Sequence, residues 1–284
     1  MDLREHQGFR VGHWTGERSG CTAVVFDEPA VASGEVRGGA PAEREFELLD
    51  PSRANNGIDA VVLGGGSVFG LAAADGAVRY LAERGRGVRF GPATVPICPA
   101  LGIFDLAEGA EPPTAESGYA AAANAARAVG DWGRVGAGRG ATVGQWRGEF
   151  LPAGIGWSAV RFRDVVVEAV VVLNAFGEPL RDLPVTSDGV FEWPDGSLLP
   201  PVKGNTTIGV VSTNAALSKV ECHLVAQGAH DGLARAVTPP HTRFDGDAFI
   251  AASTGGARTR PDTDVVRAMA VAAVERAIDS VEIG

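Results

Sequence analysis

Residues 204–214, GNTTIGVVSTN, combine a short polar turn with a run of β-branched residues. Such a run predicts a buried strand, with Thr206 at the point where the loop becomes the strand. The Thr206 hydroxyl can attack the neighbouring carbonyl group of Asn205, forming an ester that water then opens. The new chain would begin at Thr206, whose free α-amine, with a pKa of about 7.7–8.0, can activate its own hydroxyl as a nucleophile. The simpler alternative is a strand-edge threonine with no chemical role.

Length and charge limit the class of protein. The chain has 284 residues, 45% hydrophobic and 21% charged, which suits one large globular domain or two small ones. A formal net charge of -10 disfavours nucleic acid and anionic membrane surfaces as partners. The start of the chain has no apolar signal core, and the apolar run at residues 165–173 is too short to span a bilayer. We therefore expect a soluble, cytoplasmic protein.

The cysteines and histidines give no pattern typical of a metal site. Cys21, Cys98 and Cys222 are odd in number and widely spaced, which argues against a disulfide framework or a zinc ribbon. His223 and His230 are seven residues apart, without a third ligand at metal spacing. We expect no metal and no organic cofactor.

Alternating strand and helix patterns predict an α/β fold. The predicted strands are residues 21–26, 58–63, 157–162, 165–173, 248–253 and the run after Thr206. Two helices are predicted at residues 71–84 and 117–129. A third is capped by Asn214 and has one apolar face, formed by Leu217, Val220, Leu224 and Val225. The last begins at Asp262 or Thr263, and its core face is formed by Val266, Met269, Ala270, Ala273 and Val274. Residues 181–203 are rich in proline and glycine and predict an exposed linker.

Two glycine-rich loops resemble nucleotide-binding motifs only in part. Residues 64–70, GGGSVFG, lie between a predicted strand and helix, but Leu71 replaces the lysine of a phosphate-binding loop. Phe69 replaces the third glycine of a dinucleotide fingerprint and the second glycine of a nucleophile elbow around Ser67. A tight turn packed under the site explains this loop better. We interpret the second loop, residues 136–146, as backbone that approaches a ligand closely.

Polar residues stand at strand ends elsewhere. Asn174 follows a buried strand, so its amide either points into a cleft or caps the turn. Asp245 and Asp247 are two apart, which places both carboxylates on one side of an extended chain. Such a pair can hold an ammonium group or orient a hydroxyl, whereas the alternative is an Asp-Gly turn between strands.

In the order and spacing of these motifs, the chain resembles the DmpA-like self-processing aminopeptidases, peptidase family S58. That family includes β-peptidyl aminopeptidases and nylon-oligomer hydrolases. The resemblance runs nearly end to end. It rests on RGGAP at residues 37–41, GGGS at 64–67 with Gly70 and Leu71, GAG at 136–138, Asn174 with Ala175, NTT at 205–207 and DGD at 245–247.

The resemblance implies a four-layer α/β/β/α sandwich, similar in layering to N-terminal nucleophile hydrolases and shared with ornithine acetyltransferases. A single domain, residues 1–284, would cut itself between Asn205 and Thr206 into an α chain (1–205) and a β chain (206–284). By position, Thr206 would be the nucleophile, Asn174 the oxyanion-hole donor, and Asp245 and Asp247 the acidic pair. The processed protomers are expected to form a tetramer or a larger homo-oligomer.

Two positions depart from the family pattern. Members carry lysine where this chain has Gln145, and some carry tyrosine where it has Phe104. We expect both residues, with Gly138, to contact the substrate. Because Gln145 cannot supply a positive charge, the protein could be slow, altered in substrate or unable to process itself.

The sequence thus predicts an autoprocessed amidohydrolase that cleaves short peptides or small linear amides through an acyl-Thr206 ester. Two alternatives remain at this point. One is an acyltransferase of the ornithine acetyltransferase type, which passes the acyl group to an amine instead of water. The other is an unprocessed homologue without catalytic activity.

Overall fold

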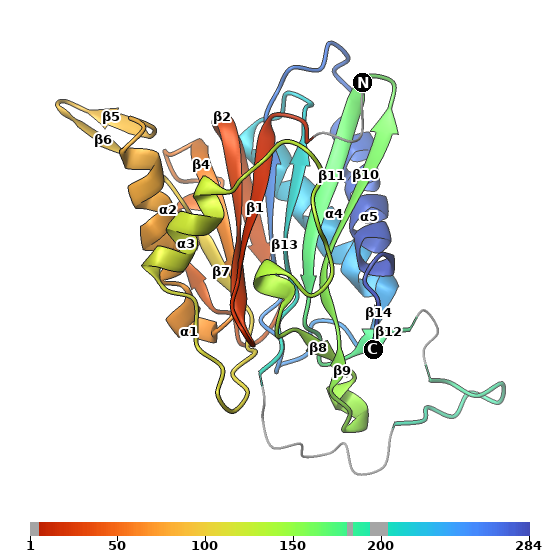
Figure 1. Cartoon of the computed structure of the whole chain (residues 1–284). Helices are drawn as coiled ribbons and strands as arrows, with labels where there is room; N and C mark the ends of the chain where they lie inside the picture. The colour runs from red at the N-terminus through yellow and green to blue at the C-terminus, as the bar shows by residue number, and fades with distance from the viewer. Residues whose placement is uncertain (1–5, 181–183, 194–203) are drawn as a thin grey trace.

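The computed structural model describes residues 6–180, 184–193 and 204–284, and its layers follow the order α/β/β/α (Figure 1). Helices α2 (Ala73–Ala82) and α3 (Ala115–Ala123) cover one outer face. Helices α4 (Lys219–Ala236) and α5 (Thr263–Asp279) cover the other. The predicted four-layer α/β sandwich is confirmed.

The two inner layers are halves of one hydrogen-bonded sheet, with strand order β10-β11-β13-β15-β2-β4-β7-β3 and β1 beside β2. These strands are β1 (Phe9–Thr15), β2 (Gly20–Val36), β3 (Glu43–Arg44), β4 (Gly57–Gly64), β7 (Ala100–Gly102), β10 (Gly154–Phe162), β11 (Val165–Leu173), β13 (Ile208–Thr213) and β15 (Ala248–Ser253). The first part of β2 pairs with β1 and β4, and its last part pairs with β15. The pairing with β4 is irregular between Val25 and Ala30, so one long strand joins the two layers.

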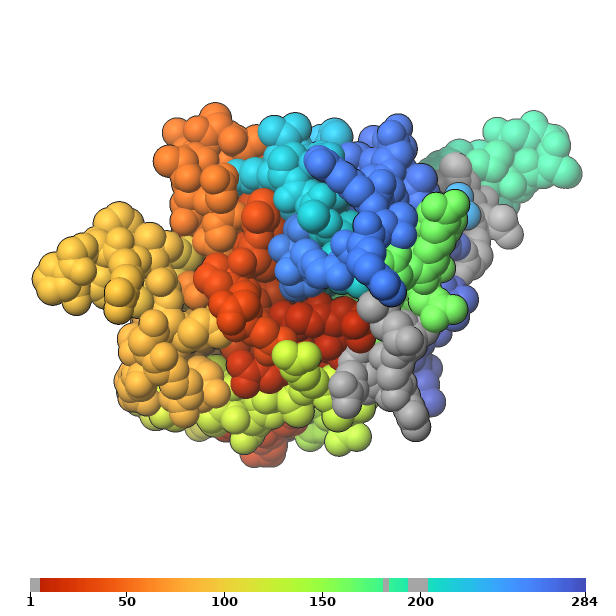
Figure 2. Space-filling view, turned by 90° about the horizontal axis from the view of Figure 1, so that it is seen from above, coloured from red at the N-terminus to blue at the C-terminus, as the bar shows by residue number. Residues whose placement is uncertain are grey.

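Smaller elements complete the fold. They are α1 (Ser67–Gly70), the 3₁₀ turns η1 (Phe46–Leu49), η2 (Gly136–Gly138) and η3 (Gln145–Arg147), and the short strands β5 (Val88–Phe90), β6 (Ala93–Val95), β8 (Thr142–Val143), β9 (Leu151–Pro152), β12 (Glu178–Pro179) and β14 (Val237–Thr238). The β5–β6 hairpin and residues 184–193 project from opposite sides of the molecule (Figure 2).

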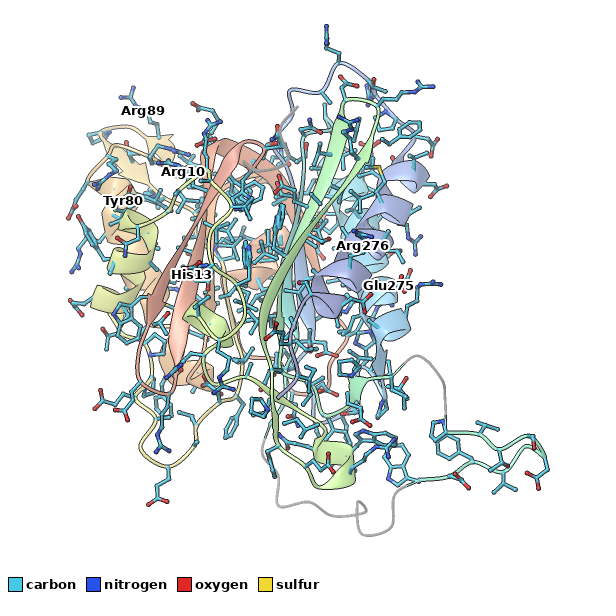
Figure 3. All side chains as sticks on the ribbon, turned by 45° about the vertical axis from the view of Figure 1, so that its right-hand side comes forward. Arg10, His13, Tyr80, Arg89, Glu275 and Arg276 are labelled. Atoms are coloured by element: carbon cyan, nitrogen blue, oxygen red, sulfur yellow. The ribbon has the colours of Figure 1, made fainter. Side chains whose placement is uncertain are left out.

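Three apolar cores hold the layers together. The central core lies between the sheet halves and includes Phe26, Leu63 and Val170. One outer core joins α4 and α5 to the sheet, and the other joins α2 and α3 to it. Side chains fill the space between these elements (Figure 3). Strand β11 is therefore buried on both faces, which explains its nearly continuous valine run.

The structure corrects three predicted helix boundaries. Ser218, not Asn214, caps the long helix, in a capping box with Glu221. Asn214 instead accepts a hydrogen bond from the Val166 N–H through its side-chain oxygen, so it braces β11. Val220, predicted to face the core, is 57% exposed, because Cys222, Val225, Ala226 and Ala229 form the buried face of α4 instead.

The other corrections are smaller. Helix α3 is capped by Thr114 and ends at Ala123, six residues before the predicted end. The helix expected from Leu71 begins at Ala73, after the single turn α1. The predicted core face of α5 is confirmed, since all five named residues are buried. Most of the predicted linker, residues 181–183 and 194–203, lies outside the described residues.

Two structural observations concern the cysteines and possible membrane-spanning helices. Cys21, Cys98 and Cys222 are all buried and free. In the part of the chain that the structure describes, no helix combines the length and the hydropathy needed to cross a membrane.

Candidate active site

Sheet pairing brings three separate polar segments to one edge of the sheet. Thr206 lies two residues before Ile208, the first residue of β13. In β13, Ile208 pairs with Val172 of the antiparallel strand β11 and with Ala248 of the parallel strand β15. The end of β11, with Asn174, and the start of β15, preceded by DGD, therefore meet the start of β13 at this edge.

The peptide bond between Asn205 and Thr206 is held on both sides. The N–H of Thr206 donates to the carbonyl oxygen of Asn174 at 2.6 Å. The carbonyl oxygen of Asn205 accepts the N–H of Gly246 at 2.9 Å, and the Thr206 hydroxyl also donates to that oxygen. A hydroxyl group and a backbone N–H donor thus meet at one carbonyl group, and Thr206 itself is only 3% exposed.

Gly246 is a site residue that sequence reasoning missed, because DGD drew attention to its carboxylates. A Cβ atom at this position would lie 2.8 Å from the Thr206 hydroxyl oxygen and 2.6 Å from the carbonyl oxygen of Ala40. Only glycine lets the backbone come this close to the hydroxyl.

The RGGAP loop, residues 37–41, wraps around the DGD segment. The N–H groups of Arg37 and Gly38 donate to the carbonyl oxygen of Asp247, and the N–H of Ala40 donates to that of Asp245. A Cβ atom on Gly38 would lie 2.2 Å from the Asp247 nitrogen. The glycines of this motif therefore allow one backbone to pack directly on another.

Asn174 is fully buried, and its amide is held at both ends. Its side-chain oxygen accepts the N–H of Thr142 at 2.9 Å, and its Nδ2 donates to the carbonyl oxygen of Phe104 at 3.2 Å. The contact between Asn174 and Thr206 is made by the backbone carbonyl of Asn174, whereas the sequence predicts its side-chain amide as an oxyanion donor. To act in that role, Nδ2 would have to exchange the Phe104 carbonyl for the oxygen of the substrate.

The two aspartates hold the backbone around Thr206 but do not bond to its hydroxyl. Asp247 accepts the N–H of Thr207 at 2.7 Å. Asp245 accepts the N–H of Phe176 at 3.0 Å and both the N–H and the hydroxyl of Thr242. Burial, and then the charge of Asp247, raise the pKa of Asp245 to about 7.

His241 is a second residue that the sequence did not reveal. Its ring Nδ1 lies 2.8 Å from the Asp247 carboxylate, which also accepts the backbone N–H of His241 at 3.1 Å. The backbone φ of His241 is 53°, a conformation that few non-glycine residues adopt. Its ring packs against buried His230, and burial lowers the pKa of His230 to about 4. Only the position of His241 shortly before DGD could have signalled this role.

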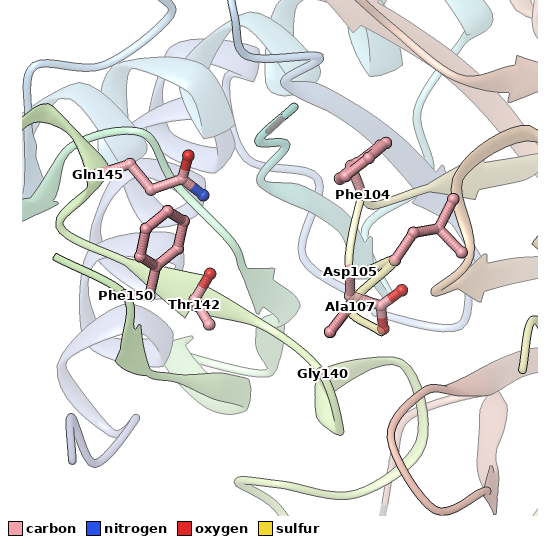
Figure 4. Close-up of a pocket in the computed structure, with 8 residues that line it drawn as sticks. Phe104, Asp105, Ala107, Gly140, Thr142, Gln145 and Phe150 are labelled. Carbon is pink, nitrogen blue, oxygen red and sulfur yellow. The ribbon is translucent and has the colours of Figure 1, made fainter. Parts of the chain in front are cut away.

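A cavity of about 150 Å³, here called the first cavity, adjoins this arrangement. Gln145 and Phe150 lie on one side of it and Phe104 on the other (Figure 4). Gln145 Nε2 donates to the side-chain oxygen of Asn205 at 2.5 Å, so Gln145 faces the bond before Thr206.

Gly138, expected near the substrate, lies elsewhere. It packs against the backbone of Ile155 and Gly133, and the same loop lines the first cavity with Gly140 and Thr142 instead. The GGGS loop forms a tight turn, in which Gly66 has a φ of 79° and donates its N–H to Asp105 at 2.6 Å. Within the described ranges, no three His, Cys, Asp or Glu side chains are grouped so that they could hold a metal ion.

The model of peptidase family S58 matches residues 3–282. The chain belongs to peptidase family S58. As a member of this family, it is a hydrolase that acts on peptide or linear amide bonds.

Two relatives of this S58 hydrolase show how far the similarity extends. An uncharacterised aminopeptidase of Mycobacterium tuberculosis is 38% identical in an alignment that covers 92% of this chain and 84% of the relative. A 6-aminohexanoate-oligomer endohydrolase of a Kocuria species is 31% identical in an alignment that covers 87% of this chain and 73% of the relative.

Solved structures share the fold. A β-aminopeptidase of a Burkholderia species matches with a TM-score of 0.71 at 22% identity, over 98% of this chain and 85% of that one. The L-aminopeptidase D-Ala-esterase/amidase of Ochrobactrum anthropi matches with a TM-score of 0.72 at 21% identity, over 96% of this chain and 83% of that one. That enzyme is described as a variant of the Ntn-hydrolase fold.

Proposed function

We propose that this S58 hydrolase is made as a precursor that cuts itself between Asn205 and Thr206. We propose further that the mature form is an aminopeptidase-like amidohydrolase with Thr206 as its N-terminal nucleophile. The observation that carries the proposal is the carbonyl group of Asn205. It has the Thr206 hydroxyl beside it, and it accepts the N–H of Gly246 at 2.9 Å.

Self-cleavage would follow from this geometry. The Thr206 oxygen adds to the carbonyl carbon of Asn205, and the Gly246 N–H stabilises the negative charge that develops on the carbonyl oxygen. The C–N bond then breaks, and the nitrogen takes up a proton to become the free α-amine of Thr206. Water hydrolyses the remaining ester, which leaves Asn205 with a carboxylate and Thr206 with its hydroxyl.

The mature reaction would use the same atoms on a separate amide. The α-amine takes the proton of the Thr206 hydroxyl while the oxygen attacks the substrate carbonyl, and Asn174 donates to the oxyanion. The leaving amine receives the proton, and water hydrolyses the acyl-Thr206 ester. Asp247 fixes the chain next to the nucleophile through the Thr207 N–H. The names of the relatives support short peptides and small linear amides as substrates.

Intact mass and N-terminal sequencing of the purified protein test the cleavage. The expected result is two fragments, the smaller of which begins at Thr206. Thr206→Ala should remain one chain and hydrolyse no aminoacyl amide or 6-aminohexanoate oligomer.

Thr207→Ala is the matched control, because the buried Thr207 hydroxyl bonds to none of the described residues. This variant should process normally. An intact wild-type chain after long incubation would contradict the proposal, as would an active Thr206→Ala variant. Assembly into a tetramer or larger and a cytoplasmic location stay predictions, which sedimentation and cell fractionation would test.

A further inference from the structure

A second cavity, of about 470 Å³, continues from the first one. The two share four lining residues, Asp105, Ala107, Gly140 and Thr142. Thr142 belongs to the shared wall, and its N–H holds the Asn174 side chain at 2.9 Å. One hydrogen bond therefore links the wall of the second cavity to Asn174, the residue proposed to stabilise the oxyanion.

Volume indicates that a ligand would use both cavities. Small-molecule sites typically measure roughly 300–1,000 Å³. The first cavity, at about 150 Å³, is too small to hold such a ligand by itself. A substrate whose amide reaches Thr206 would therefore extend past the shared residue Gly140 into the second cavity.

Three arginines, Arg18, Arg134 and Arg139, line the second cavity. Two of them are held by backbone carbonyl groups, since Arg18 Nη1 donates to Glu108 at 2.8 Å and Arg139 Nε donates to Glu17 at 2.9 Å. Within the ranges that the structure describes, no carboxylate oxygen lies within 4.0 Å of a guanidinium nitrogen of these three arginines.

Other arginines, such as Arg89 and Arg161, also lack a carboxylate partner among the described residues, so the distinguishing feature is that three such arginines line one cavity. Two acidic side chains also line the second cavity, Glu17 and Asp105. Asp105 is buried, its carboxylate already accepts the Gly66 N–H at 2.6 Å, and burial raises its pKa. The guanidinium groups therefore keep donors that are available to a ligand.

We infer that the arginine-lined cavity binds the carboxylate at the far end of a linear amide substrate. A guanidinium group presents paired N–H donors that match the two oxygens of a carboxylate. A linear chain of amino-acid units carries such a carboxylate at one end, whichever amide bond is cut. The inference rests on the proposed function and narrows its substrate class to linear amides with a free carboxylate.

Binding to the Thr206→Ala variant tests this without turnover. The probes are 6-acetamidohexanoate and its primary amide, which differ only in the terminal charge. The carboxylate should bind about 5–10-fold more tightly than the amide. Arg134→Gln and Arg139→Gln should each weaken carboxylate binding about 2–5-fold, the range expected for a partly exposed ion pair, and leave amide binding unchanged.

Arg161→Gln is the control, because Arg161 is exposed at the far end of β10 from the site. It should change neither affinity. If Arg139→Gln fails to fold, Arg134→Gln decides, since the Arg134 side chain makes no hydrogen bond to the residues described. Equal affinities for the two probes, or equal losses for both in the arginine variants, would overturn the inference. Wild-type protein that hydrolyses no amide would instead contradict the proposed function.

Discussion

The N–H of Gly246 donates to the carbonyl oxygen of Asn205 at 2.9 Å, while Asp245, the preceding residue, pairs with Asn205 as a parallel β-bridge. The DGD segment therefore holds the bond before Thr206 through its backbone. Its two carboxylates instead accept hydrogen bonds from the backbone N–H groups of Thr207, Phe176 and Thr242, which surround that bond. The role of the segment as a backbone scaffold leads to the first prediction.

Gly246→Ala should strongly slow self-cleavage. The added Cβ would lie 2.8 Å from the Thr206 hydroxyl oxygen, closer than non-bonded atoms normally approach, so either the hydroxyl or the Gly246 N–H must move. Loss of one oxyanion donor typically lowers turnover about 10²–10³-fold, and processing should slow by at least that factor. Mass spectrometry of freshly made protein over time measures the rate.

Gly130→Ala is the control for the added methyl group, because a Cβ there has no heavy atom within 4 Å. This variant should process at the wild-type rate. Normal processing of folded Gly246→Ala would show that the contact between Gly246 and Asn205 has no part in the reaction.

The second prediction concerns His241, which holds the Asp247 carboxylate through Nδ1 at 2.8 Å. A hydrogen bond to a charged group contributes about 1.5–3 kcal/mol, so His241→Ala should lower the free energy of unfolding by about that amount and slow self-cleavage. Asn tolerates a positive φ better than Ala, so His241→Asn should retain more of both. Urea unfolding and the processing rate measure the two effects.

His223→Ala is the comparison, since His223 bonds to the carbonyl oxygen of Gly34 and is distant in sequence from DGD. It should leave the processing rate unchanged. A His241→Ala variant that unfolds and processes like the wild type would remove His241 from the site.

The sequence predicted the parts of the site that follow from strand patterns. The valine run of β11 and the β-branched run after Thr206 marked two buried strands, and their antiparallel pairing brings Asn174 beside Thr206. The two-residue spacing of Asp245 and Asp247, together with the family resemblance, predicted the acidic pair. Buried strands of this kind are predictable because local residue types and the burial of both faces favour the same conformation.

Contacts that depend on tertiary packing were not predictable. The N–H of Gly246 donates to Asn205 while the RGGAP loop binds the carbonyl groups of Asp245 and Asp247, and no local sequence pattern encodes this arrangement. The sequence predicts Asn214 as a helix cap. In the structure its side-chain oxygen accepts the N–H of Val166 in β11 at 2.8 Å, and Ser218 caps the helix instead. A polar residue after a strand has several competing partners, and only packing selects one.

The third prediction is a pH dependence of stability caused by Asp245. Burial, and then the charge of Asp247, raise its pKa to about 7, whereas an unfolded aspartate has a pKa of about 3.9. Between these values the folded state binds more protons than the unfolded state, so the free energy of unfolding falls as the pH rises. The contribution of Asp245 is fully present below about pH 4 and lost above about pH 7, a change on the order of 1–4 kcal/mol.

Urea unfolding at pH 5 and pH 8, in the Thr206→Ala background, measures this contribution. Asp245→Asn should be less sensitive to pH over that interval than its parent, because asparagine does not titrate. Asp231→Asn is the control: ion pairs with Arg37 and Arg267 lower the pKa of Asp231, so it titrates below the interval. Equal pH dependence in parent and Asp245→Asn would contradict the assignment.

The last prediction concerns Gln145, which stands where the family resemblance implies lysine and donates to the Asn205 side chain at 2.5 Å. A lysine here would place a positive charge near the Thr206 amine, and a nearby cation lowers the pKa of an amine. More of the amine would then be free base at neutral pH. We expect the native protein to work best at a more alkaline pH than lysine-bearing relatives, and Gln145→Lys to shift the rising limb of its pH–rate profile towards acid. Gln145→Met, similar in length and uncharged, should leave that limb in place. Hydrolysis rates of processed, folded variants measured across pH decide the matter, and a profile that Gln145→Lys does not move would show that charge at this position leaves the amine unaffected.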